Sequence, residues 1–83
     1  MAQLKGIIST VKRDVARKTN MGTVSRPVEG GNPLAFTAAF SLNLAPGDIV
    51  VYEIPENNVL QVRTTKTMPR DLKVKILKIL KKA

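Results

Sequence analysis

Apolar side chains occupy every second position of the nine-residue stretch Phe36-Thr37-Ala38-Ala39-Phe40-Ser41-Leu42-Asn43-Leu44. A period of two puts alternate side chains on the same face, so this stretch predicts a strand with one buried face. The turn-forming residues Ala45-Pro46-Gly47-Asp48 come next, followed by the apolar run Ile49-Val50-Val51-Tyr52-Glu53-Ile54. That run is long enough for a second, more deeply buried strand. The two segments together predict a mainly β fold.

Three more strands are predicted on either side of this pair. Residues 4–11 are rich in β-branched types, residues 22–25 form a short apolar segment that ends at Arg26-Pro27, and residues 59–65 follow a turn containing Pro and Asn. The polar residues 12–20 between the first two predict a basic loop or a hairpin turn. The predicted strands are therefore 4–11, 22–25, 36–44, 49–54 and 59–65.

The C-terminal segment has a different character. Apolar residues from Leu72 to Leu80 fall on one face at helical spacing, lysines take the other face, and Pro69 is well placed near a helix start. Residues 72–76 also alternate with period two, so a strand remains an alternative. We expect a basic helix, which divides the chain into a small β-barrel over 1–66 and a basic amphipathic extension over 67–83 packed on it.

The composition excludes most kinds of catalysis. The 83 residues include no Cys and no His, so disulfides, thiolate nucleophiles, imidazole bases and the usual zinc and haem ligands are absent. The glycines do not form a phosphate-cradling loop, and no His is present to activate a Ser or Thr. We therefore expect no enzyme, no metal, no cofactor and no small-molecule substrate. Since no stretch of eighteen apolar residues or leader-like run occurs, we also expect a cytoplasmic protein that binds no membrane.

The net charge of +8 is distributed unevenly. Residues 1–28 contain six Lys and Arg and one carboxylate, whereas residues 29–62 contain four carboxylates and no Lys or Arg. Residues 63–83 contain eight Lys and Arg and one carboxylate. If the fold brings the two basic ends together, it produces a polarised molecule with one surface suited to a polyanion, of which nucleic acid is the leading candidate.

Several segments resemble those of a cold-shock domain between about residues 4 and 66. Lys5-Gly6-Ile7-Ile8 is similar to the family's opening strand, and Gly22-Thr23-Val24 and Phe36-Thr37-Ala38-Ala39-Phe40 occupy the places of its two ribonucleoprotein motifs. Residues 44–54 are similar to its fourth strand and lead-in. The resemblance implies a five-stranded Greek-key barrel of the oligonucleotide-binding kind, here with a basic C-terminal helix.

The chain departs from that family in its aromatic residues. The family's second strand exposes two rings, whereas Met21, Thr23 and Val24 stand here. Phe36 and Phe40 share the apolar side of their strand, which indicates core positions. Residues 42–54 also resemble the second half of a swapped-hairpin transcription regulator, a dimeric DNA-binding barrel that would require residues 34–43 to be helical.

The predicted site consists of cations near the loop after the first strand and at the ends of other strands, plus one tyrosine. Cations close together in a loop can track phosphates without reading sequence, and an outward tyrosine can stack on a base. The predicted nucleic-acid-binding residues are Lys5, Lys12, Arg13, Arg17, Lys18, Arg26, Tyr52, Arg63 and Lys66. A second basic surface is predicted from Arg70, Lys73, Lys75, Lys78 and Lys82.

The function predicted from the sequence is binding of nucleic acid with low sequence specificity, preferably of single-stranded RNA or DNA. With so few rings, binding should depend strongly on salt. One alternative is a protein-interaction or assembly module, and another is the dimeric swapped-hairpin DNA-binding regulator. A homodimer is compatible with each of these functions.

Overall fold

The computed structural model describes residues 2–69 and 71–83. It contains five strands, β1 (Ala2–Asp14), β2 (Thr19–Val24), β3 (Leu34–Ala39), β4 (Ile49–Ile54) and β5 (Lys73–Lys81). Between β4 and β5 lie the 3-10 turn η1 (Glu56–Asn58) and the short helix α1 (Val59–Thr64). The fold is therefore mainly β, as the alternation in residues 36–44 and the apolar run 49–54 predict.

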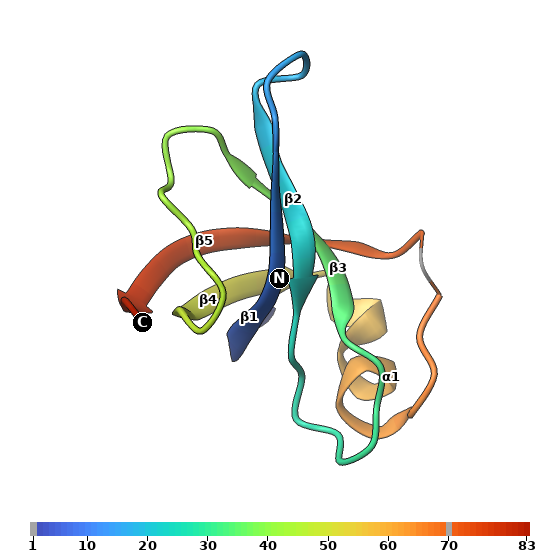
Figure 1. Ribbon diagram of the computed structural model, residues 1–83. Helices are drawn as coiled ribbons and strands as arrows, with labels where there is room; N and C mark the ends of the chain where they lie inside the picture. The colour runs from blue at the N-terminus through green and yellow to red at the C-terminus, as the bar shows by residue number, and fades with distance from the viewer. Residues whose placement is uncertain (1, 70) are drawn as a thin grey trace.

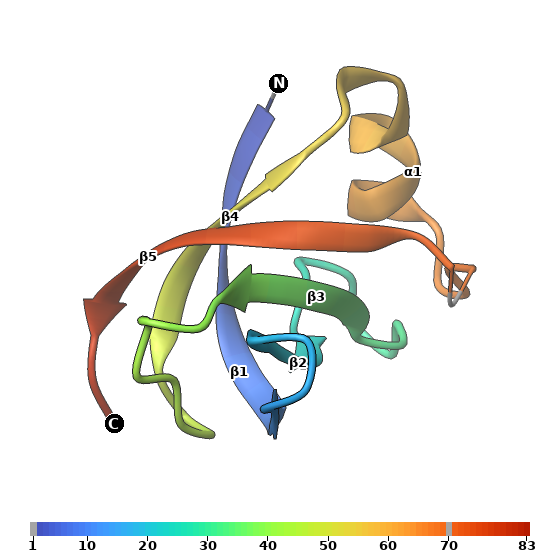
Figure 2. The ribbon, with the colours of Figure 1, turned by 90° about the horizontal axis from the view of Figure 1, so that it is seen from above.

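The strands form one five-stranded sheet with the order β1-β2-β3-β5-β4, and β4 pairs in turn with β1. All neighbouring pairs are antiparallel except β3 and β5, which are parallel. The connection between β4 and β5 joins neighbouring antiparallel strands and contains α1, which lies at the end opposite the β1–β2 turn (Figure 1; Figure 2 shows β5 running beside β3 and on across β4).

The core lies inside the curved sheet, where side chains of alternate positions meet. Phe36 and Tyr52 are its largest members, and both are fully buried or nearly so. Val62 is the buried residue of α1, and Met68 closes the same end of the sheet. The buried apolar cluster consists of Ile8, Val24, Leu34, Phe36, Ala38, Val50, Tyr52, Ile54, Val62, Met68, Val74 and Ile76.

The prediction for the last third of the chain was wrong in two places. Residues 59–64, predicted as a strand, form α1, and the predicted C-terminal helix is strand β5. β5 buries Val74 and Ile76 and exposes Lys73 and Lys75, so the period of two decides its structure. A strand here also supplies a partner to both β3 and β4, which would otherwise present unpaired backbone groups. Residues 73–81 are thus part of the sheet and not an extension packed on it.

The bounds of β1, β2 and β3 also differ from the prediction: β1 begins at Ala2, β2 covers Thr19–Val24 and β3 begins at Leu34. β1 continues to Asp14 and forms a hairpin with β2 through the turn 15–18, which is the hairpin alternative for residues 12–20. β3 ends at Ala39, so the predicted strand over 36–44 is shortened by a turn. Because residues 34–39 are a strand, the helix that a swapped-hairpin regulator would require over 34–43 is not formed.

Candidate nucleic-acid interface

The β1–β2 hairpin orients one row of side chains outward. Thr10 lies opposite Thr23, and their hydroxyl oxygens are 2.8 Å apart. Lys12 lies opposite Met21, two residues further along each strand. Because Val24 and Asn20 point inward and are buried, Met21 and Thr23 lie on the outer surface of the sheet.

These two cross-strand pairs, Thr10–Thr23 and Lys12–Met21, are continued by outward residues of β3 and β5. Met21 lies opposite Thr37, which lies opposite Lys75 in the parallel pair. Thr23 lies opposite Ala35, which lies opposite Lys73. The buried positions of β3 and β5 alternate with these, so all of them face outward. We call this surface the β1–β2–β3–β5 face; it consists of Thr10, Lys12, Met21, Thr23, Ala35, Thr37, Lys73 and Lys75.

Small, neutral side chains form the centre of this face, and lysines stand at its two sides. Lys12 comes from the N-terminal basic segment, while Lys73 and Lys75 come from the C-terminal one. Three strand spacings separate β1 from β5, which corresponds to about 14 Å along the sheet. The fold therefore brings cations that are some sixty residues apart in the chain onto one surface.

A hollow of about 420 Å³ opens on this face beside the rows of Thr23 and Ala35. Its remaining walls are Asn32 and Pro33, which precede β3, and Pro69, which precedes β5. The Asn32 amide group is already occupied, since its oxygen accepts from the Met68 backbone N–H at 2.8 Å. The hollow therefore offers mainly apolar and methyl-bearing walls to a ligand.

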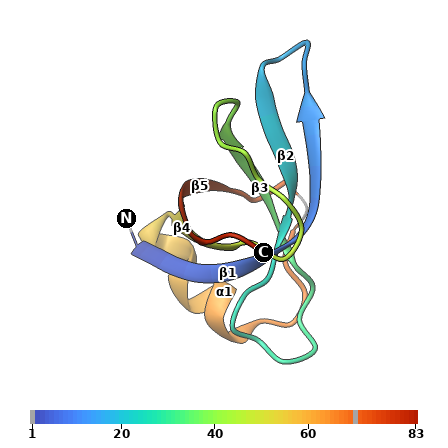
Figure 3. The same cartoon turned by 60° about the vertical axis from the view of Figure 1, so that its left-hand side comes forward.

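The tip of the hairpin carries two of the predicted cations. Arg17 is exposed and forms an ion pair of 3.8 Å with Asp14, whose carboxylate also accepts the Arg17 backbone N–H at 3.1 Å. Lys18 has a positive φ of 52°, which lets the turn close onto β2. The β1–β2 turn projects beyond the rest of the sheet (Figure 3), so this pair of cations stands apart from the face and extends its reach.

Arg26 does not belong to the interface, so this prediction was wrong. Its side chain is buried inside the fold, with 8% of the residue exposed. The guanidinium donates to the carbonyl oxygens of Asn32, Val62, Thr65 and Lys66 and to the Asn32 side-chain oxygen. Burial lowers the pKa of the guanidinium, while neighbouring Tyr52 acts in the opposite direction. Arg26 thus fastens the loop after β2 to the end of α1.

Tyr52 is also unable to stack on a base, which corrects a second prediction. Its side chain is fully buried, and its hydroxyl donates to the Ser25 carbonyl oxygen at 3.3 Å. Burial raises the pKa of the phenol to about 12, and the nearby Arg26 charge offsets part of that rise. The ring is a core residue with a hydrogen-bonded polar end.

The remaining predicted cations are distributed over other surfaces. Lys5 and Lys78 lie on either side of Val51 on the outer surface of β1, β4 and β5. Arg63 and Lys66 are exposed at the α1 end of the sheet. Arg70 lies outside the described residues.

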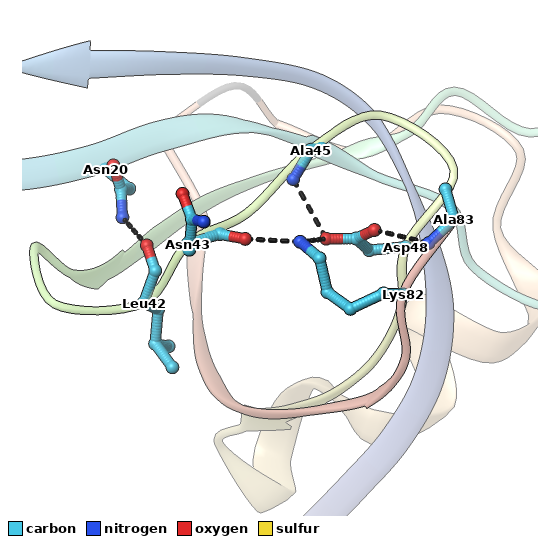
Figure 4. A network of polar contacts seen from close by, with 7 residues as sticks. All are labelled: Asn20, Leu42, Asn43, Ala45, Asp48, Lys82 and Ala83. Carbon is cyan, nitrogen blue, oxygen red and sulfur yellow. Dashed lines mark hydrogen bonds and ion pairs between the residues drawn. The ribbon is translucent and has the colours of Figure 1, made fainter.

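Lys82 has a structural partner near the C-terminus of β5. Its ammonium group donates to the Asp48 carboxylate at 2.5 Å and to the Asn43 carbonyl oxygen (Figure 4). The buried Asp48 also accepts the backbone N–H groups of Ala45, at 2.9 Å, and Ala83, at 2.8 Å. These hydrogen bonds, above all the one from Lys82, lower the pKa of Asp48 despite its burial. Asp48 therefore joins the β3–β4 connection to the end of β5.

Sequence reasoning missed part of this interface. The neutral residues Thr10, Met21, Ala35 and Thr37 were not predicted as site residues, and only the strand register shows that they lie between the cations. Phe40, predicted as core, lies in the turn after β3 and is partly exposed. The Arg13 guanidinium carbon lies over its ring, 3.8 Å from the centroid.

Comparison with known proteins gave no relative: no family model, curated protein or solved structure matches this chain. Within residues 2–69 and 71–83, no group of three or more His, Cys, Asp or Glu side chains is placed to hold a metal ion. None of the helices in the same ranges has the length and apolar character needed to cross a membrane. The assignment of function therefore depends on the geometry of the interface.

Proposed function

We propose that this protein binds single-stranded nucleic acid through the β1–β2–β3–β5 face, with low sequence specificity and without catalysing a reaction. The observation that carries the proposal is the register that sets Lys12 on one side of this face and Lys73 and Lys75 on the other. Cations on both sides of a neutral strip can contact successive phosphates of a strand that crosses it.

The neutral strip favours a single strand over a duplex as ligand. Met21, Thr23, Ala35 and Thr37 offer methyl groups, a thioether and hydroxyls, which can contact the faces and edges of unpaired bases. A duplex buries its base faces and presents phosphates outward. Because no ring stands on this strip, base contacts are weak, and the phosphate contacts make binding strongly dependent on salt.

The fold supports the same proposal. We propose that the closed strand order with a parallel β3–β5 pair is an oligonucleotide-binding Greek-key barrel, similar in kind to a cold-shock domain. In such barrels the outer surface of the second and third strands and the loop after the first strand contact the ligand. These elements correspond here to the β1–β2–β3–β5 face and to the hairpin tip with Arg17 and Lys18.

The test compares two variants that lose the same charge on different surfaces. One carries Lys12→Gln, Lys73→Gln and Lys75→Gln on the proposed face. The matched control carries Lys5→Gln, Lys78→Gln and Lys81→Gln, three exposed lysines on the outer surface of β1, β4 and β5. Binding of a single strand of about 12 nucleotides and of the corresponding duplex is measured by fluorescence anisotropy at several salt concentrations.

We expect the face variant to lose affinity for the single strand and to reduce the slope of log K against log salt by about 2, since each phosphate contact contributes about 0.7. The control variant should change the slope by less than half as much. Equal losses in the two variants would show that only net charge matters. Absence of binding by the unmodified protein at low salt would refute nucleic-acid binding itself.

The second candidate function, an assembly module, is favoured by one apolar feature of the opposite surface. Ile7 is 51% exposed and lies opposite Ile49 in the β1–β4 pair. Ile49 is only partly exposed, but an exposed isoleucine beside it on a sheet surface can contact another protein, including a second copy of this chain. Light scattering distinguishes the candidates, because a stable oligomer that has no affinity for oligonucleotides supports assembly and contradicts our first proposal.

A further inference from the structure

We call the outer part of the β1–β2 hairpin, residues 10–23, the hairpin arm. It has a second surface, opposite to the one that carries Lys12. Arg13 lies opposite Asn20, which lies opposite Ala38, and both of these partners are buried. Arg13 is therefore on the inward surface of the arm, near the point where β3 ends. Its guanidinium packs on the ring of Phe40, in the first turn after β3.

The turn that carries Phe40 is fastened to the arm by hydrogen bonds. The Asn20 side-chain amide donates to the carbonyl oxygens of Ala39, at 3.0 Å, and Leu42, at 2.8 Å; the second of these is visible in Figure 4. The Leu42 backbone N–H donates back to Ala39 at 3.0 Å. Phe40 lies between these tethered residues in the chain, so the hydrogen bonds hold the backbone that carries the ring beside Arg13.

The packed guanidinium keeps one of its planar surfaces available. Arg13 as a residue is exposed, although Phe40 covers one side of its guanidinium. Asp14, its neighbour, pairs with Arg17, and no carboxylate among residues 2–69 and 71–83 forms an ion pair with Arg13. A guanidinium that lies over a ring on an exposed residue and forms no ion pair is a stacking partner for a nucleobase.

The edge of β1 gives a strand access to both surfaces of the arm. β4 pairs with β1 only from Ala2 to Ile7. From Thr10 to Asp14, β2 is the only strand among the described residues that pairs with β1, so the other edge of β1 has no strand partner there. This edge lies between Lys12 on the outer surface and Arg13 on the inner one. A nucleic-acid strand can therefore contact Lys12 with a phosphate and turn an adjacent base over the edge onto Arg13.

We propose that Arg13, held on Phe40, stacks on one nucleobase of a bound single strand and so supplies the ring contact that the β1–β2–β3–β5 face lacks. The inference rests on the proposed single-strand binding and adds a base-dependent contact to a phosphate-dependent one. It takes any base, because every base has a π surface.

The test separates stacking from charge. Arg13→Lys keeps the positive charge and removes the planar group, and Phe40→Leu removes the platform. The matched control is Arg63→Lys, the same exchange on an exposed arginine of α1 that lies away from the proposed interface and packs on no ring among the described residues. Each protein is titrated with a thymidine oligomer of about 12 nucleotides and with an abasic oligomer of equal length and phosphate number. Circular dichroism verifies that each variant is folded.

We expect Arg13→Lys to weaken binding of the thymidine oligomer about tenfold and to leave binding of the abasic oligomer within about twofold. Phe40→Leu should likewise weaken binding of the thymidine oligomer and leave binding of the abasic oligomer nearly unchanged, and Arg63→Lys should change neither affinity. If Arg13→Lys binds the thymidine oligomer as the unmodified protein does, or loses both oligomers equally, the inference is overturned while single-strand binding stands. Unmodified protein that binds neither oligomer overturns both proposals.

Discussion

Replacing Arg26 by Met removes a buried cation that holds the β2–β3 loop and the end of α1 together. The guanidinium makes five hydrogen bonds, to the loop between β2 and β3 at Asn32 and to the end of α1 at Val62, Thr65 and Lys66. Met fills a similar length of space but donates no hydrogen bond, so all five acceptor positions lose this partner.

The cost follows from the number of acceptors left behind. A hydrogen bond to a charged group contributes about 1.5–3 kcal/mol, but the contributions of one side chain do not add fully and removal of the charge relieves its desolvation. We expect a net loss of about 3–5 kcal/mol in the free energy of unfolding. At about 0.05–0.15 kcal/mol per residue, a chain of this length has about 4–12 kcal/mol in total. The single substitution therefore removes a large part of the stability.

The assay is urea unfolding followed by circular dichroism, supported by hydrogen exchange. With a slope of about 1 kcal/mol per molar urea, the midpoint should fall by about 3 M or more. Protection in α1 and in the connection that leads to β5 should fall first, because Arg26 fastens that segment. Arg63→Met is the control, since Arg63 is exposed on α1 and its loss should cost less than about 0.5 kcal/mol.

A result close to the control would refute this reasoning. If Arg26→Met lowers the free energy of unfolding by less than about 1 kcal/mol, the buried hydrogen bonds do not fasten α1 to the β2–β3 loop. Arg26→Lys adds a second measurement. It keeps the charge but has a compact ammonium in place of the planar fork, so it should recover only a small part of the loss.

Of three further predictions, two concern the buried polar side chains of Tyr52 and Asp48, and the third concerns Gly22, where two backbone segments approach closely. Because burial raises the pKa of Tyr52 to about 12, its contribution to stability is complete below its ordinary value near 10 and is lost as the pH rises through about 12; spectroscopic titration of the phenol at a value near 10 would contradict this. The pKa of Asp48 is lowered, so its contribution is present above its ordinary value near 4 and is lost as the pH falls toward the folded-state value; Asp48→Asn should flatten the acid limb of stability measured by thermal unfolding, and an unchanged limb would refute its role. Gly22→Ala would set a Cβ 2.0 Å from the Thr10 carbonyl oxygen and should cost about 3 kcal/mol in urea unfolding, whereas a loss below about 1 kcal/mol would show that the β1–β2 pair can yield.

The elements that periodicity predicts correctly are those whose pattern has one interpretation. Residues 49–54 form β4 with the predicted bounds, because an apolar run of six between turn residues has few other uses. Residues 72–80 satisfy both a helical and a strand pattern, and the open edges of β3 and β4 decide between them. Residues 59–64 resemble a strand by composition, yet they form α1, a helix in the β4–β5 connection whose one buried residue is Val62. Such decisions depend on partners far along the chain.

The sequence predicted that the candidate interface would be basic, but it did not predict which residues would lie on it. The basic ends and acidic centre of the sequence indicate the polyanion, and Lys12, Lys73 and Lys75 lie on one surface as an interface requires. No local signal distinguishes Arg26 from these lysines, because its burial comes from carbonyl oxygens about forty residues later. Tyr52 is fixed by the same kind of long-range contact.

The strand order sets different side chains between the lysines of β1 and β5 on the two routes around the sheet. In the closed strand order, β1 and β5 are connected by two series of paired strands, which we call arcs. The first arc passes through β2 and β3, and the second passes through β4. In the second arc the middle strand places Glu53 beside Lys75, and a carboxylate at cross-strand distance weakens the attraction for a phosphate. In the first arc the middle strands present Met21 and Thr37, which carry no charge. Lys12 and Lys73 therefore have only uncharged cross-strand neighbours on β2 and β3, whereas Lys75, the third lysine of the β1–β2–β3–β5 face, also lies beside Glu53.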